Sequence, residues 1–340
     1  MDYDGLVLPY PVGRRLSADE MARRLEIGVA VEAVPNGHFA VIRRDASSLE
    51  IVDKYYEWKG SMTLFAMLGL AVLGTPIALA IAALLESQTA FSGSERGGAI
   101  ILVCVIACIG LPVLGLCGWL LSREMFTWTH YPVLFDRSRQ RVLVRRTRRG
   151  TDVLEIAWSD VFWHARHSKN KPTGVYTWFL AGHVLERDGK TVRETFSFGR
   201  SASSPEELDP LWEFVRRFMQ EGADSMPQPP ASLPIANRRE DFLWGAHMLL
   251  FVAPANLALT VALLPLLAPA AVCRWVAMRT NRPPRWPASL AAHEPLDAVV
   301  AAPPAVPGYS RVRVAAALVS GLAVAAWLAW WLLATALPVR

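Results

Sequence analysis

The residues best suited to chemistry in this chain are arginines, which crowd into one short stretch. Seven of them fall within thirteen residues, with Asp136 and Asp152 only at the edges. A guanidinium binds phosphate oxygens bidentately, and basic segments near a bilayer are attracted to anionic headgroups. The stretch therefore predicts contact with anionic lipid headgroups or with a protein partner. The seven are Arg137, Arg139, Arg141, Arg145, Arg146, Arg148 and Arg149.

The same stretch has a plainer interpretation. It forms a solvated hairpin whose charge only fixes the topology of the chain in the membrane, with no specific ligand. A specific phosphate ligand is a third alternative. Nucleic acid is not expected as a partner, because no aromatic residues alternate with the arginines to stack on bases.

The histidines predict no metal site. His164 and His167 are three residues apart, and on a strand that spacing directs side chains to opposite faces. His183 is expected to be an ordinary surface or strand residue. His247 and Asn256 lie in a hydrophobic block, where polar groups are functional candidates by default. If that block is interfacial, His247 simply lies at headgroup level.

Catalytic motifs are not recognisable in the sequence. It contains no nucleophile elbow, zinc-protease motif, phosphate-binding loop or dinucleotide fingerprint. No cofactor and no metal are predicted, and the sequence favours a protein that is not an enzyme. The cysteines lie in hydrophobic blocks and are expected to act as small apolar side chains. They are Cys104, Cys108, Cys117 and Cys273.

Composition sets the class to which these residues belong. The 340 residues are 53% hydrophobic and 19% charged, against about 45–50% and about 25% in soluble domains. Four stretches of 26 residues or more contain no Asp, Glu, Lys or Arg: 60–85, 97–122, 242–273 and 314–339. The third of these contains one histidine, His247. A bilayer core needs about 20 apolar helical residues. The sequence thus predicts an integral membrane protein, with no cleaved leader expected at its start.

Basic residues predict the orientation. They cluster before the first span and after the second, whereas the link between these spans has only Arg96. The positive-inside rule then places the N-terminus and residues 123–222 in the cytoplasm of a bacterium, with the chain in its inner membrane. The third block has arginines on both sides, so a re-entrant, an interfacial or a spanning segment stays open. The re-entrant or interfacial form would leave the C-terminus outside.

The predicted soluble centre, residues 123–222, has six strand patterns, at 131–136, 141–147, 153–158, 160–167, 175–187 and 191–199. An N-cap at Ser204 then precedes an amphipathic helix whose apolar stripe includes Trp212. Strands closed by one such helix are typical of a pleckstrin-homology-like barrel. An α+β sheet with the helix on one face is the alternative. The fold class is a helical membrane protein with an inserted cytoplasmic β-rich domain.

The predicted organisation has seven parts. Before the membrane, Ser17 and Glu20 form a capping box, a hairpin turns at Pro35-Asn36-Gly37, and residues 47–59 are helical. The parts are an N-terminal cytoplasmic region 1–59, a transmembrane hairpin 60–122, the β domain 123–222, a linker 223–241, the third hydrophobic segment 242–273, a proline-rich loop 274–313 and a C-terminal transmembrane helix 314–340.

Two stretches carry a resemblance to a known family. One comprises residues 131–137 (YPVLFDR), 141–146 (RVLVRR) and 158–162 (WSDVF), and the other comprises 274–280 (RWVAMRT) and 284–287 (PRWP). Over about residues 50–290 the chain resembles an uncharacterised family of proteobacterial membrane proteins, classed as a domain of unknown function. The resemblance implies genes near type VI secretion and toxin genes, and an accessory or immunity role. It implies no catalytic residues.

These observations favour a non-enzymatic inner-membrane protein that presents a cytoplasmic docking domain at the bilayer, with an unidentified protein partner. The competing hypothesis is a transporter or membrane-embedded enzyme whose site lies in the third block, around His247 and Asn256. A proton relay or ion-coupled transporter would need paired acids within a span, and the sequence has none.

Overall fold

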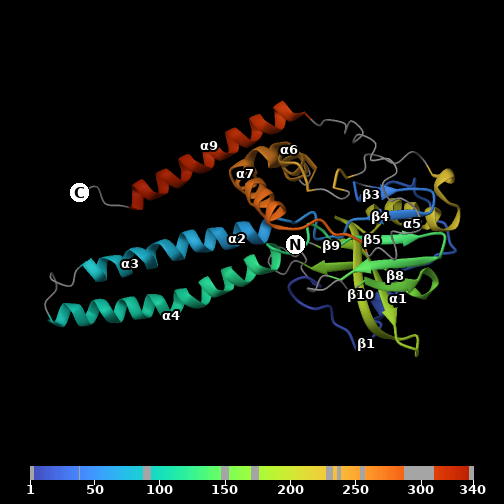
Figure 1. The fold of residues 1–340 in the computed structure, drawn as a ribbon, viewed down its shortest axis with the longest axis horizontal. Coiled ribbons are helices and arrows are strands. Elements are labelled where there is room, and N and C mark those ends of the chain that lie inside the picture. The colour runs from blue at the N-terminus through green and yellow to red at the C-terminus, as the bar shows by residue number, and fades with distance from the viewer. Residues whose placement is uncertain are drawn as a thin grey trace. The chain divides into compact units, whose positions relative to one another are not determined.

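Strands from distant parts of the sequence assemble into one body in the computed structural model (Figure 1). The chain divides into a sheet unit, formed by Met1–Trp58, Trp128–Ala253 and Arg282–Ala315, and a helix unit, formed by Lys59–Thr127, Pro254–Asn281 and Ala316–Arg340. The structure describes residues 4–37, 39–86, 93–146, 153–169, 176–226, 233–235, 239–252, 257–286 and 310–336.

The sheet unit contains two five-stranded antiparallel sheets, so the fold is mixed α+β. One sheet has the order β1-β10-β9-β8-β2, and the other has the order β3-β4-β5-β6-β7. The strands of the first are β1 (Arg14–Arg15), β2 (Arg24–Leu25), β8 (Val161–Lys169), β9 (Tyr176–Leu185) and β10 (Thr191–Ala202). Those of the second are β3 (Val41–Arg44), β4 (Ser48–Ile51), β5 (Val133–Asp136), β6 (Arg141–Arg145) and β7 (Val153–Ala157).

An aromatic cluster forms the core of this unit. Phe135 on β5 packs edge-on against Trp158 and against Phe198 on β10, with ring centroids 5.9 and 5.3 Å apart. Trp163 on β8 also contacts Phe135. These rings come from both sheets, so burying them holds the sheets together.

Helix α5 (Asp209–Gln220) completes the core. Trp212 is fully buried and stacks on Trp158, with centroids 5.8 Å apart and planes 23° from parallel. The predicted apolar stripe is confirmed, because all its members are buried: Leu208, Leu211, Trp212, Val215, Phe218 and Met219. The helix begins later than an N-cap at Ser204 predicts, since a 3₁₀ turn (Glu206–Leu208) comes first.

The six strands predicted in the centre of the chain are confirmed as β5 to β10. The Asp188-Gly189 turn joins β9 to β10, with Gly189 at φ +64°. The carboxylate of Asp188 accepts hydrogen bonds from the backbone N–H groups of Lys190 and Thr191 at 2.9 and 2.8 Å. Local turn chemistry therefore fixed this hairpin.

The N-terminal predictions are partly wrong. The capping box of Ser17 and Glu20 is present and begins α1 (Ala18–Ala22). The hairpin, however, is β3–β4, and it turns at Asp45, whose carboxylate accepts from the N–H groups of Ser47 and Ser48. The helix expected over residues 47–59 is replaced at its start by β4, because pairing with β5 buries Leu49 and Ile51.

The helix unit is built from long apolar helices. The first passes from α2 (Ser61–Gly69) through a π-helical turn (Leu70–Gly74) into α3 (Thr75–Glu86) and packs against α4 (Gly93–Glu124). The others are α7 (Leu257–Thr280) and α9 (Arg311–Ala336), which approach closely at Gly321. Among the described residues, three helical stretches are long and apolar enough to cross a membrane: Ser61–Leu79, Ala258–Thr280 and Arg311–Trp331.

The described residues of the third hydrophobic block belong to three helical elements. The short helix α6 (Phe242–His247) runs into a π-helical turn (Met248–Val252), and α7 follows after residues 253–256. The block therefore ends in a helix that extends beyond Cys273 to Thr280.

Within the helix unit, the ends of three helices share buried polar contacts. The carboxylate of Glu124, at the end of α4, accepts hydrogen bonds from the N–H groups of Gly60 and Thr63 at 2.7 and 2.6 Å. The Asn281 side chain, just beyond α7, donates to the Glu124 carbonyl and accepts from the Thr127 N–H. An anion at the start of α2 satisfies N–H groups that lack helical partners and complements the helix dipole.

We predict that Trp212→Ala lowers the free energy of unfolding of the sheet unit by about 3–5 kcal/mol, because it removes a buried ring from the aromatic core. The measurement is urea unfolding of the full chain in a mild detergent, followed by far-ultraviolet circular dichroism. Val34→Ala is the control, since Val34 is 81% exposed. Equal unfolding midpoints for the two variants would show that α5 is not part of the core.

Candidate functional site

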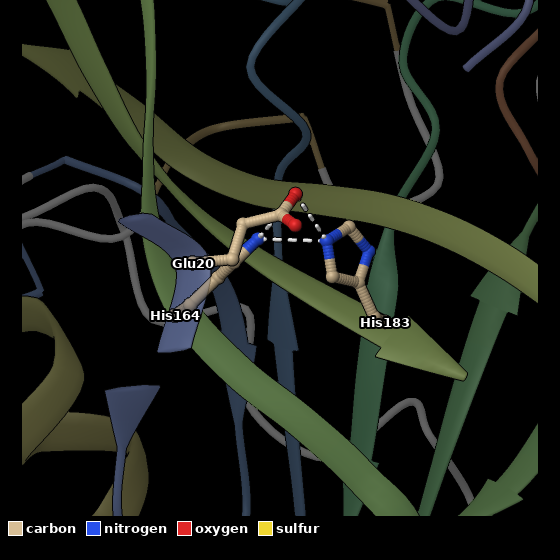
Figure 2. A group of neighbouring side chains, drawn as sticks. All are labelled: Glu20, His164 and His183. Atoms are coloured by element: carbon tan, nitrogen blue, oxygen red, sulfur yellow. Dashed lines mark hydrogen bonds and ion pairs between the residues drawn. The ribbon is translucent and has the colours of Figure 1, made fainter. Parts of the chain in front are cut away.

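Three side chains that could bind a ligand together meet on one face of the β8–β10 sheet. They are Glu20 from α1, His164 from β8 and His183 from β9 (Figure 2). The Nε2 atoms of the two imidazoles are 2.9 Å apart, and the Glu20 Oε1 atom is 3.0 Å from His183 Nε2 and 3.9 Å from His164 Nε2. Both histidines are fully buried.

Strand register brings the two histidines together. His164 lies opposite Ala181, and Phe162 lies opposite His183, so the histidines are diagonal neighbours on the same face. Thr195 on β10 lies opposite His183, and its hydroxyl is 2.8 Å from the Nδ1 atom of that histidine. Pairing of β2 with β8 sets Arg24 opposite His164, just after α1.

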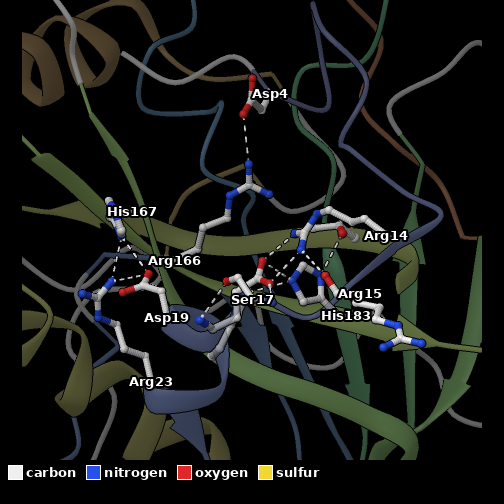
Figure 3. Close-up of polar contacts among 12 residues, drawn as sticks. Asp4, Arg14, Arg15, Ser17, Asp19, Arg23, Arg166, His167 and His183 are labelled. Carbon is white, nitrogen blue, oxygen red and sulfur yellow. Dashed lines mark hydrogen bonds and ion pairs between the residues drawn. The ribbon is translucent and has the colours of Figure 1, made fainter. Parts of the chain in front are cut away.

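Glu20 is held by its own helix terminus and by an arginine. Its Oε2 atom accepts from the Ser17 N–H at 2.9 Å, as the capping box requires. Arg14 on β1 donates to both carboxylate oxygens, at 2.8 and 2.5 Å (Figure 3). Arg166, on the same strand as His164, donates a hydrogen bond to the Asp4 carboxylate, with Nη2 and Oδ2 3.0 Å apart. The Glu20 carboxylate is therefore fixed from three sides.

The electrostatics keep the imidazoles neutral and the carboxylate ionised. Burial lowers the pKa of His164 to about 3 and that of His183 to about 4. Burial alone would raise the pKa of Glu20, but the hydrogen bonds from Arg14, Ser17 and His183 outweigh it and hold that pKa well below its usual range. Neutral imidazoles and an ionised carboxylate are the protonation states in which these groups bind metal ions.

The histidine that joins His164 is His183. It lies on strand β9, which agrees with the expectation of a surface or strand residue, and it is fully buried. His167 lies apart from the cluster, with its Nδ1 atom 2.8 Å from Arg23 and 3.5 Å from Asp19. His247 is buried on α6. Asn256, the other polar candidate of the third block, lies outside the described residues.

The arginine-rich stretch is divided in the structure. Three of its arginines are exposed and have acidic neighbours: Arg139 is 3.9 Å from Asp136, Arg146 is 2.6 Å from Glu194, and Arg141 pairs with Glu155. Arg137 is half-buried. Arg148 and Arg149 lie outside the described residues.

Arg145 is buried, unlike the exposed members of the stretch. Its guanidinium lies over the ring of Trp128, 4.6 Å from the centroid, and 5.9 Å from that of Trp286. The Trp286 indole N–H donates to Glu50 at 2.9 Å, and burial raises the pKa of that carboxyl. The structure thus gives Arg145 packing contacts within the sheet unit.

A cavity of about 430 Å³ lies beside the arginine-rich strand, within the sheet unit. Its lining includes the basic residues Arg145, Arg146 and Arg193, together with Tyr10 and Thr195. A concave site with a few convergent polar groups is the usual form of a small-ligand pocket. Asp53 and Glu194 also line the cavity, and Arg146 is paired with Glu194, so its lining carries charges of both signs.

Sequence reasoning missed Glu20 and His183 as site residues. Glu20 carried a signal only for helix capping, and nothing in the sequence aligned His183 with His164. Their pairing depends on the β8–β9 register, which brings together two residues that are 19 positions apart in the sequence.

A comparison with known families matches more than half of the chain. A model described as a family of unknown function, DUF6708, matches residues 111–296, which is more than half of the chain. No curated protein and no solved structure matches the chain. The matched range includes His164 and His183, whereas Glu20 and strands β1 to β4 precede it.

We predict that acid destabilises the metal-free chain through the two histidines. Their pKa values are about 3 and 4 when folded, against about 6.5 in an unfolded chain, so the unfolded state binds more protons between these limits. Their contribution to stability is complete above about pH 6.5 and is lost as the pH falls toward 4. The measurement is the free energy of unfolding against pH, with a chelator present.

His164→Gln removes one of these protons, so the slope of that curve should fall by up to about 1.4 kcal/mol per pH unit. His167→Gln is the control on the same strand and should leave more of the slope in place. An unchanged slope in His164→Gln would contradict the prediction.

Proposed function

Because the chain belongs to DUF6708, a family of unknown function, we propose its role from its own residues: it is a non-enzymatic integral protein of the bacterial inner membrane that holds its sheet unit in the cytoplasm as a docking module. The observation that carries this proposal is the pairing of β4 with β5. These strands flank the first two long helices, and they match Ile51 with Val133.

The pairing constrains how often the chain between these strands crosses a bilayer. A sheet cannot form across a membrane, so residues 48–51 and 133–136 must lie in one compartment. The intervening helices, α2–α3 and α4, then cross an even number of times. Two crossings agree with their lengths, since about 20 residues of helix span the bilayer core.

The same reasoning applies to the third hydrophobic block. After α7 the chain returns to the sheet unit, where Thr129 donates to the Arg282 carbonyl at 3.0 Å and Trp286 donates to Glu50. Residues 242–281 therefore begin and end in one compartment. Helix α6 and its π-helical turn contain only 11 residues and are too short to cross. This supports a re-entrant or interfacial segment.

Exposed apolar side chains on the helices support burial in lipid. Val72 is 66% exposed, Val261 58%, Val319 68% and Trp330 64%. Large apolar surface of this kind has to be covered by lipid or by protein. Starting from the sheet unit, α9 then makes a single crossing and takes the C-terminus to the outside.

The docking module has a pleckstrin-homology-like architecture in this proposal. Strands β3 to β7 follow one another in one sheet, β8 to β10 form the core of the next, and α5 comes last with Trp212 in the core. The exposed arginines Arg139, Arg141 and Arg146 contact anionic headgroups. Exposed ion pairs contribute only about 0–1 kcal/mol to stability. The acidic neighbours of these arginines therefore do not prevent them from binding lipid headgroups.

The physiological setting that we propose is type VI secretion or protection against its toxins, with an unidentified protein partner. Its support is the resemblance to membrane proteins encoded near such genes. An accessory or immunity protein of this kind needs a fixed membrane location and a folded surface for its partner, and both are parts of the proposal above.

We predict the topology by fusion. Green fluorescent protein inserted after Gly222 fluoresces and alkaline phosphatase there is inactive, whereas phosphatase inserted after Ser94 is active. The expectation follows from the β4–β5 pairing and from the arginines that flank the first span. Phosphatase activity after Gly222, or fluorescence after Ser94, would contradict the proposed topology.

We predict that the arginine-rich hairpin approaches anionic lipid. Ser138→Cys, in a chain with its four cysteines replaced by alanine, carries an environment-sensitive dye. In nanodiscs with phosphatidylglycerol the dye emission shifts to the blue relative to phosphatidylcholine discs. The shift should fade at 1 M salt, because the Debye length falls from about 10 Å at 0.1 M to about 3 Å.

Arg139→Gln, Arg141→Gln and Arg146→Gln together should abolish this shift. The matched control replaces Arg15, Arg24 and Arg187 with glutamine. These arginines are exposed and lie elsewhere on the sheet unit. Equal emission of the unaltered chain in both kinds of disc would instead support a hairpin whose arginines only fix topology.

A further inference from the structure

We propose that Glu20, His164 and His183 bind a divalent transition-metal ion of the zinc class, with the Oε1 atom of the carboxylate and both Nε2 atoms as ligands. This site is independent of the membrane role. The ion would link the N-terminal helix α1 to strands β8 and β9. Its fourth ligand would be a water molecule.

The spacing of the three donor atoms suits such an ion. The distances between them are 2.9, 3.0 and 3.9 Å. Ligand atoms about 2.0–2.1 Å from a tetrahedral zinc ion are separated by about 3.3 Å, so only small side-chain movements are needed to place an ion among them. Two histidines and one glutamate are an established donor set for zinc with one open position.

Without an ion, the protons of the two imidazoles can be placed in two ways. If His183 Nε2 carries its proton and donates to Glu20, His164 must present a lone pair there, which puts its own proton on Nδ1. That Nδ1 atom is buried and has no hydrogen-bond partner among the described residues. If His164 Nε2–H donates to His183 instead, the lone pair of His183 faces the ionised Glu20 oxygen at 3.0 Å.

A cation would accept all three lone pairs at once and would remove the repulsion of the second arrangement. It would keep the His164 proton on the unpartnered Nδ1 atom, as in the first arrangement. The carboxylate is the one acidic ligand of the three. Two arginines lie nearby: Arg14 is paired with Glu20 itself, and Arg166 is paired with Asp4.

The surrounding contacts resemble those that orient metal ligands. Histidine ligands commonly use their second ring nitrogen for a hydrogen bond, and ligating carboxylates are themselves hydrogen-bonded. Thr195 fills the first role for His183, at 2.8 Å from Nδ1. Arg14 and the Ser17 N–H fill the second role for Glu20. These contacts hold the ligands before the ion arrives.

The test uses the full chain in detergent, carrying an affinity tag without histidines. The protein is stripped with a chelator, incubated with zinc and desalted, and its zinc is measured by inductively coupled plasma mass spectrometry. We expect about one ion per chain in the unaltered protein and in His167→Gln. We expect at least a tenfold loss in His183→Gln and in Glu20→Gln.

Glu20→Gln is the sharper variant, because glutamine preserves the capping-box geometry while the negative charge is lost. Zinc should also raise the melting temperature of the unaltered chain but not of this variant. Cobalt added to the unaltered chain gives a second reading, since tetrahedral Co²⁺ with nitrogen and oxygen ligands has visible absorption bands. This measurement uses only the unaltered chain, so it does not depend on whether a variant folds.

Two results would overturn the proposal. One is zinc well below one ion per chain in the unaltered protein after reconstitution, together with no visible cobalt bands. The other is equal zinc content in the unaltered chain and in folded Glu20→Gln and His183→Gln. The three residues would then form a hydrogen-bonded network only, while the membrane topology experiments would keep their own outcome.

Discussion

The pairing of β4 with β5 is the constraint on which the rest of the molecule depends. It joins Ile51 to Val133 across the whole of the α2–α3 and α4 hairpin, so the apolar helices are an insertion within a β fold. Closing so long a loop costs entropy, although the cost grows only slowly with length. Burial of Leu49, Ile51 and Phe135, each with no exposed surface, opposes that cost.

The aromatic core follows from this pairing. With β4 and β5 side by side, Phe135 faces Trp163 and Phe198 from the other sheet, and Trp212 closes the cluster through Trp158. The core contains large flat rings whose packing is sensitive to volume. A domain whose strands come from both sides of a long helical insertion cannot form until the two ends of that insertion are brought together, so folding of the sheet unit depends on how the helices α2–α3 and α4 fold.

Local patterns were sufficient for much of the fold. The six central strands, the Asp188-Gly189 turn, the Ser17–Glu20 capping box and the apolar stripe of α5 each depend on residues close in sequence. The structure of residues 29–59 was predicted wrongly, since their pattern indicates a hairpin at Pro35-Asn36-Gly37 and a helix beyond Ser47. The strand conformation of β4 depends instead on pairing with β5, which lies more than 80 residues away in the sequence. Propensity is a weak guide where tertiary pairing decides.

The cluster of Glu20, His164 and His183 could not be predicted from the sequence for the same reason. Each of the three residues belongs to a different element, and only the β8–β9 register and the β2–β8 pairing bring them together. The capping box explained Glu20 locally, yet its carboxylate serves both the helix terminus and the histidines. Because α1 is only five residues long, its own backbone holds it weakly. Contacts with the sheet therefore hold it in place. Glu20 contacts Arg14 on β1 and His183 on β9 at once, Asp19 lies near His167, and β2 pairs with β8 directly after α1.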